Sequence, residues 1–143
     1  MKIIAMILCA MLLGVSCAHA SVLPADTVTQ TWFMPESLSS FIAAQLDMNG
    51  QSCRLTDPAS LDTLSQLLTN VNDLGVPMAG CPFGAKLQLL LTDGQLVILD
   101  LATDSCCIYR VDGRDYQYAR HLKSGDNGVA NTCLFDLFGV TVP

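Results

Sequence analysis

Three short turn signals constrain the fold of this chain more than any other feature. Asn49-Gly50, Asp93-Gly94 and Asp112-Gly113 each separate two short runs that are rich in apolar residues. Asn-Gly and Asp-Gly pairs tolerate the positive φ angles of two-residue hairpin turns, so each pair predicts a tight antiparallel hairpin. The sequence therefore predicts an antiparallel β-meander, with strands at 41–47, 52–56, 86–92, 95–101, 106–111 and 114–120.

The hairpin around Asp112-Gly113 can be checked by its side-chain pairs. A two-residue turn places Arg110 opposite Asp115 and Tyr109 opposite Tyr116. One pair is ionic and the other aromatic, and both kinds of cross-strand pair stabilise a sheet. The pairing therefore supports this turn and this register.

The hairpin around Asp93-Gly94 has apolar residues on both of its faces when it is paired in the same way. A sheet that is apolar on both sides needs two covering layers, or it leaves part of one face exposed for a partner or for dimerisation. Both alternatives remain open from the sequence. The residues expected on the candidate interaction face are Leu90, Val97, Leu99 and Leu101.

One main helix is expected between the two groups of strands. Asp57 suits the N-cap position and Pro58 the first helical position, and Gly75 and Pro77 follow the helix. Leucines recur at helical spacing over residues 58–72. A shorter apolar run at 133–138 could form a second helix. The predicted fold class is α+β, an antiparallel β-meander of about four to six strands packed on one main helix, with a short C-terminal helix and disulfide staples.

The N-terminal residues are typical of a secretion signal. Lys2 provides a positive charge, residues 3–15 form an apolar run, and Ala18-His19-Ala20 fits a signal-peptidase site. We therefore expect cleavage before Ser21 and a secreted or periplasmic protein. The expected division of the chain is a signal peptide at 1–20, a tether or edge segment at 21–40, and a single α+β domain at 41–143.

An alternative export signal overlaps the first. Leu13-Gly14-Val15-Ser16-Cys17 resembles a bacterial lipobox, in which the cysteine becomes the lipidated first residue. Gly14 stands where that pattern prefers leucine, so soluble export is the favoured reading. Lipidation at Cys17 would instead anchor the protein to the extracytoplasmic membrane surface, and only in that case do we expect contact with a membrane.

Five cysteines follow the predicted cleavage site, and an oxidising compartment should bridge most of them. Five is an odd number, so one cysteine is left unpaired or links two copies of the chain into a homodimer. Adjacent strand residues point to opposite faces, so Cys106 and Cys107 should bridge to different partners. The pairing itself stays open. The candidate disulfide residues are Cys53, Cys81, Cys106, Cys107 and Cys133.

Charge and motif content exclude several function classes. After residue 20 the chain has six basic residues against thirteen acidic ones, which disfavours a nucleic-acid partner. His121 is the only histidine in that part, and no Cys-x-x-Cys spacing, P-loop or nucleophile elbow occurs. We therefore expect no metal, no cofactor and no catalytic residue.

A few short motifs resemble those of a broader group of proteins. They are Leu55-Thr56-Asp57-Pro58 before a leucine-rich helix, Asp93-Gly94 between strands, and Asp104-Ser105-Cys106. Over about residues 40 to 140 the chain resembles small secreted or lipid-anchored bacterial domains of unknown function. This resemblance implies no chemistry and assigns no role to any residue.

The sequence best fits a non-catalytic extracytoplasmic module that binds an unknown protein or small ligand. Two alternatives stay open. A thiol-dependent secreted enzyme would need an exposed, reactive cysteine. A cystatin-like protease inhibitor is the other, since one helix followed by a four-stranded meander also describes that architecture.

Overall fold

The protein is represented by a computed structural model that describes residues 15–18, 34–104, 106–118 and 134–141. For residues 15–18 it describes the backbone only. Predictions about the apolar signal segment, the segment 21–33, His121 and Cys133 therefore lie outside the described residues. Within the described ranges, none of the helices has the length and apolar character needed to cross a bilayer.

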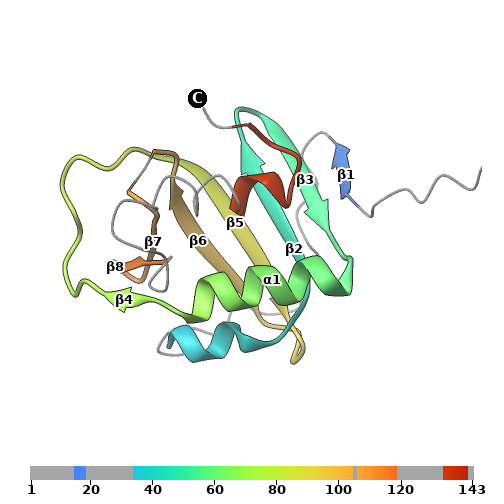
Figure 1. Ribbon diagram of the computed structural model, residues 1–143, viewed down its shortest axis with the longest axis horizontal. Coiled ribbons are helices and arrows are strands. Elements are labelled where there is room, and N and C mark those ends of the chain that lie inside the picture. Colours follow the sequence, from blue (N-terminus) through green and yellow to red (C-terminus); the bar gives the residue numbers. More distant parts are fainter. Residues whose placement is uncertain (1–14, 19–33, 105, 119–133, 142–143) are drawn as a thin grey trace, which may run out of the picture.

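Eight strands form one antiparallel sheet in the order β1-β3-β2-β5-β6-β7-β8-β4 (Figure 1). Their bounds are β1 Val15–Ala18, β2 Phe41–Met48, β3 Gln51–Leu55, β4 Asn72–Asp73, β5 Phe83–Leu91, β6 Leu96–Ala102, β7 Ile108–Val111 and β8 Arg114–Gln117. The helices are the 3₁₀ helix η1 (Pro35–Ser39) and α1 (Pro58–Thr69). A helical turn at 134–136 lies where a C-terminal helix was expected.

The α+β class and the single main helix are confirmed, but the sheet is larger than the four to six strands predicted. All six predicted strands are present, and β1 and β4 add one further strand at each edge. Neither edge strand has a strand-like sequence pattern of useful length. Each forms because a neighbouring strand offers an open edge to pair with.

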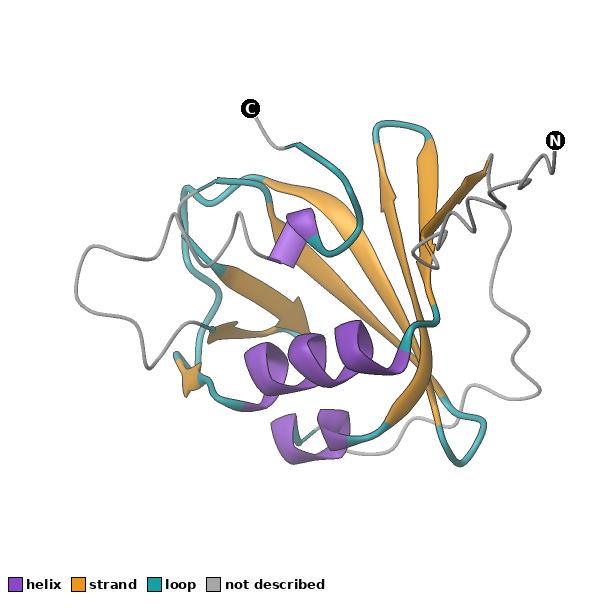
Figure 2. Cartoon of the chain, turned by 45° about the vertical axis from the view of Figure 1, so that its right-hand side comes forward, coloured by secondary structure: helices purple, strands orange, loops and turns teal. Residues whose placement is uncertain are grey.

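All the described helices lie on one face of the sheet, which we call the inner face (Figure 2). α1 packs Leu61, Leu64 and Leu68 against this face, and η1 adds Leu38, which is fully buried although it belongs to the segment 21–40. The inner-face core also contains Leu46, Leu55, Leu87, Leu89, Leu99, Leu101, Tyr109, Tyr116, Leu134, Phe135 and Phe138. The opposite side of the sheet is called the outer face.

Two of the predicted hairpins have the predicted register. Asn49 and Gly50 have φ angles of 53° and 76°, and Met48 pairs with Gln51. Asp112 and Gly113 have φ angles of 50° and 73°, as a two-residue turn of this type requires. Arg110 pairs with Asp115 and Tyr109 with Tyr116 in β7 and β8, as expected.

The register predicted around Asp93-Gly94 is wrong by one residue. The Gly94 N–H donates to the Leu91 carbonyl at 3.0 Å and the Leu91 N–H to the Gln95 carbonyl at 2.8 Å. Gly94 has a φ of 86° whereas Asp93 stays outside the positive-φ region, so the turn is a three-residue loop with a glycine bulge. Because side chains alternate along a strand, this shift by one residue exchanges the faces of β6 relative to β5.

The main helix begins where expected and ends earlier. The Asp57 carboxylate accepts the Ser60 N–H at 2.9 Å, which confirms the N-cap. The helix ends at Thr69 instead of residue 72, and Asn70 is its C-cap. Asn72 and Asp73 pair with β8 instead, so strand pairing at the sheet edge replaces the last helical turn.

Truncation of a core leucine tests this packing. Leu64 is fully buried between α1 and the sheet, so Leu64→Ala should lower the free energy of unfolding by about 2–5 kcal/mol. Ile42→Ala is the control, because Ile42 is 56% exposed, and its expected effect is below about 0.5 kcal/mol. Urea unfolding followed by circular dichroism measures both, and equal midpoints for the two variants would contradict this packing.

Candidate binding site on the outer sheet face

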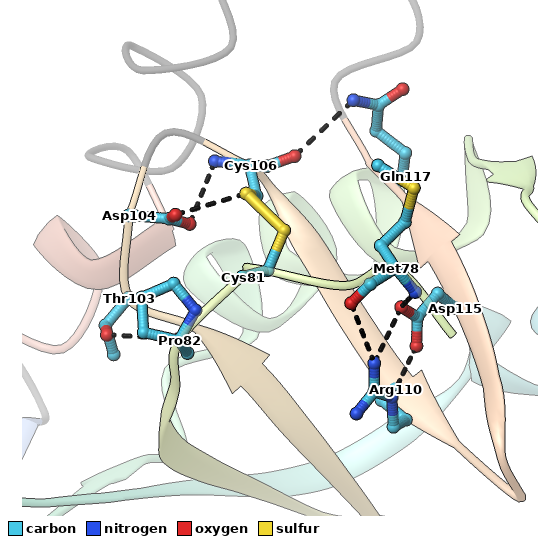
Figure 3. Close-up of a disulfide and its surroundings, with 9 residues drawn as sticks. All are labelled: Met78, Cys81, Pro82, Thr103, Asp104, Cys106, Arg110, Asp115 and Gln117. Carbon is cyan, nitrogen blue, oxygen red and sulfur yellow. Dashed lines mark hydrogen bonds and ion pairs between the residues drawn. A yellow bond between two sulfur atoms is a disulfide. The ribbon is translucent and has the colours of Figure 1, made fainter.

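Two of the five candidate cysteines, Cys81 and Cys106, form a disulfide (Figure 3). It joins the loop before β5 to the turn before β7. The Cys106 N–H donates to Asp104 Oδ1 at 3.0 Å, and Asp104 Oδ2 lies 3.1 Å from Cys106 Sγ. These three residues are close enough to hold a metal ion. With both sulfurs in a disulfide, however, the cluster lacks the thiolates that a metal ion would need.

Two further cysteines with described side chains, Cys53 and Cys107, are buried. Cys53 is 2% exposed and disulfide-bonded, and Cys107 is a fully buried thiol. The expected strand 106–111 starts only at Ile108, because Cys107 has a φ of 52° that a strand does not accommodate. The expectation that Cys106 and Cys107 alternate along a strand is therefore wrong. Among Cys53, Cys81, Cys106 and Cys107, the cysteines whose side chains the structure describes, none has a thiol at the surface.

An ion pair between Arg110 and the buried Asp115 lies at the β7–β8 end of the outer face. Asp115 is fully buried and accepts hydrogen bonds from Arg110 Nε at 2.6 Å, Arg110 Nη2 at 2.9 Å and the Met78 N–H at 2.6 Å (Figure 3). The Arg110 guanidinium also lies 4.1 Å from the centroid of the Phe83 ring. This cluster fixes the loop before β5 on the sheet.

A second polar cluster lies at the other end of the outer face, with Asp47 at its centre. Gln45 Nε2 donates to Asp47 Oδ1 at 3.0 Å, and Ser52 Oγ and Gln88 Nε2 also donate to this carboxylate. The donors come from β2, β3 and β5, which are adjacent in the sheet. Gln45 is only 2% exposed and Gln88 8%. Asp47 thus organises three neutral polar side chains in a largely buried network.

Two buried polar atoms in this region have no hydrogen-bond partner: Arg54 Nε and Gln88 Oε1. Arg54 and Gln88 pair with the two sides of Gln45, so the three residues form one row across β3, β2 and β5. A buried donor or acceptor without a partner costs about 1–3 kcal/mol. In native structures such atoms bind ordered water or an ion, or they mark strain or a functional site.

The cluster borders a hollow of about 500 Å³. This volume lies within the range of small-molecule sites. At its rim Lys86 Nζ contacts Asp100 Oδ1 at 2.7 Å, and both side chains are exposed to solvent. The polar residues that line the hollow are Gln45, Asp47, Asn49, Gln51, Ser52, Lys86, Gln88 and Asp100. The lining therefore offers carboxylate, amide and hydroxyl oxygens to a ligand that carries hydrogen-bond donors.

The structure separates the four residues expected on the interaction face. Leu99 and Leu101 are fully buried on the inner face, and Val97 packs against the same core. Leu90 pairs with Leu96 on the outer face and is partly buried. The one-residue shift of the β5–β6 register accounts for this difference.

The polar residues of the hollow were not predicted as a site. A signal was present in the sequence, since Gln45, Asp47 and Gln88 interrupt runs that are otherwise apolar.

Cys17, the alternative lipidation site, pairs with Cys53 in the Cα register of β1 and β3. Its lipidation stays a prediction.

Comparison with known proteins found no similar family: no family model matches the chain, and no curated protein or solved structure matches it either.

Proposed function

We propose that the protein is a non-catalytic extracytoplasmic binding module that holds the ammonium group of a small ligand in the outer-face hollow. The Asp47 carboxylate supports this proposal most directly. It is partly buried, and its three hydrogen-bond donors are all neutral. Lys86, its cross-strand neighbour on β5, forms an ion pair with Asp100 instead.

An ammonium group would supply the donor that Gln88 Oε1 lacks and a positive counter-charge to Asp47. It would supply a positive charge beside Asp47 and carry three donors, which suit the carboxylate and the acceptor oxygen of Gln88. The chain has a formal net charge of −6, which favours the approach of a cation. The Cys81–Cys106 disulfide indicates an oxidising compartment and supports a location outside the cytoplasm.

The alternatives have weaker support. A thiol-dependent enzyme needs an exposed thiolate. The four cysteines with described side chains offer none, because Cys107 is fully buried and Cys53, Cys81 and Cys106 are in disulfides. A cystatin-like inhibitor was suggested by a helix that precedes the meander. Here a two-strand hairpin precedes α1 and joins the same sheet.

Thermal unfolding with matched ligands tests the proposal. The panel contains glucosamine with glucose, and putrescine with 1,4-butanediol, so that each amine has a partner that lacks the charge. At an amine concentration 100 times the dissociation constant, binding should add about 2.7 kcal/mol of stability and raise Tm by several degrees. Glucose and 1,4-butanediol, which lack the charge, should raise Tm much less.

Asp47→Asn is the informative variant, because it keeps the shape of the side chain and removes the charge. We expect it to weaken amine binding at least tenfold, as loss of a charge-assisted hydrogen bond implies. Asp62→Asn is the matched control, since Asp62 is an exposed residue of α1, which lies on the inner face. Equal amine binding by both variants, or no effect of any amine on the unaltered protein, would refute the proposal.

A further inference from the structure

The strand β1 lies within the residues that the sequence predicts to be removed on export. It consists of Val15–Ala18, pairs antiparallel with β3, and covers the edge of the sheet. A chain that begins at Ser21 lacks β1, so β3 becomes the edge strand. An edge strand carries unpaired N–H and C=O groups that can pair with another strand.

The backbone groups that become available belong to Ser52 and Arg54. Met48 and Gln51 flank a two-residue turn and therefore form a hydrogen-bonded pair. Such pairs alternate along an antiparallel ladder, so Cys53 and Leu55 bond to β2 while Ser52 and Arg54 direct their N–H and C=O groups toward the open edge.

β3 shares a Ser-Cys pair with the strand that would be removed, β1. In β1, Ser16 pairs with Arg54 and Cys17 with Cys53. β3 contains the same Ser-Cys pair, as Ser52 and Cys53. If β3 of a second copy lies antiparallel with its Cys53 opposite Cys53, then its Ser52 lies opposite Arg54, as Ser16 does in β1.

We propose that export cleavage opens the β3 edge and that the mature chain forms a symmetric dimer by antiparallel β3–β3 pairing centred on Cys53. The arrangement is two-fold symmetric, as most homodimer interfaces are. Each Arg54 lies opposite a serine, so no like charges face each other. Four backbone hydrogen bonds join Ser52 and Arg54 of the two copies. Cys53 is disulfide-bonded in the structure, and the pairing needs no bond between the two Cys53 sulfurs.

The proposal rests on the predicted cleavage and not on ligand binding in the hollow. Its test uses protein purified after export, with the N-terminus established by intact mass. Sedimentation velocity over a concentration series should show a dimer of chains that begin at Ser21. A mass that retains any of residues 15–18, or a monomer at every concentration, would overturn the proposal.

Two variants at one position separate backbone pairing from side-chain contacts. Arg54→Pro removes an N–H that points to the edge, a place where strands accept proline, so the fold should persist and the dimer should dissociate. Arg54→Ala keeps the N–H and should remain dimeric. A dimer in Arg54→Pro as stable as in Arg54→Ala would contradict backbone pairing.

Hydrogen exchange of the unaltered exported protein gives a readout that does not depend on variant folding. The amide protons of Ser52 and Arg54 should be protected at high protein concentration and lose this protection on dilution. Protection that does not depend on concentration would show that no second copy covers these groups.

Discussion

Asp115→Ala should lower the free energy of unfolding by about 3–5 kcal/mol, one of the largest effects we expect from a single substitution. Asp115 is fully buried and accepts hydrogen bonds from both Arg110 and the Met78 backbone. Its removal leaves the Arg110 guanidinium without its partner and the Met78 N–H without an acceptor. A loss of this size is a large fraction of the 5–15 kcal/mol typical of a folded domain.

Chemical denaturation of Asp115→Ala and Asp73→Ala forms the matched experiment. Asp73 also pairs with an arginine, Arg114, at 2.6 Å, but both side chains of that pair are exposed to solvent. Surface ion pairs contribute little, so Asp73→Ala should have a much smaller effect. Similar losses in the two variants would contradict the role assigned to burial at Asp115.

The Asp115 carboxylate should also make the free energy of unfolding depend on pH. Burial alone would raise the pKa of Asp115, but the hydrogen bonds from Arg110 and Met78 and the positive charge of Arg110 together lower it. An aspartate whose pKa is lowered by folding stabilises the protein above its unfolded pKa of about 3.9 and loses that contribution as pH falls through the folded value. Stability should therefore fall below about pH 4, with a shallower fall in Asp115→Ala.

Removal of the disulfide is the second large effect. Cys81 and Cys106 are 25 residues apart in the sequence. By the entropy of the closed loop, the variant Cys81→Ser/Cys106→Ser should lose about 3–4 kcal/mol of stability. Guanidinium unfolding without reductant measures this loss, and a midpoint equal to that of the unaltered protein would contradict it.

The stability lost on removing the disulfide should depend on whether Asp115 is present. Met78 lies three residues before Cys81, and its N–H donates to Asp115. The disulfide and the buried ion pair therefore hold the same loop on the sheet. Neighbouring substitutions of this kind are not additive, so the triple variant should lose less than the sum of the separate losses.

The two Asp-Gly hairpins illustrate how far the sequence could predict the fold. Around Asp112-Gly113, an ionic pair and an aromatic pair fit only one register, and that register is present. Around Asp93-Gly94, nearly every residue of both strands is apolar, so a shift by one residue leaves the pattern unchanged. Turn chemistry alone could not decide between a two-residue loop and a three-residue loop with a glycine bulge.

The candidate site on the outer face was missed because it depends on the order of the strands in the sheet. Asp47 and Gln88 are 41 residues apart in the chain and meet only because β2 pairs with β5. Strand order is not encoded in any local pattern of this sequence. The helix cap at Asp57 was predictable because its hydrogen bond to Ser60 spans three residues.

Two-dimensional NMR with ¹⁵N-labelled protein tests the proposed function most directly, by locating where an amine binds. During a titration with glucosamine, we expect the largest shifts in the backbone amides of Asp47, Ser52 and Gln88 and in the side-chain amides of Gln45 and Gln88. Residues of α1, on the inner face, should change little. Shifts that concentrate on α1, or no shifts at saturating glucosamine and putrescine, would contradict an amine site on the outer face.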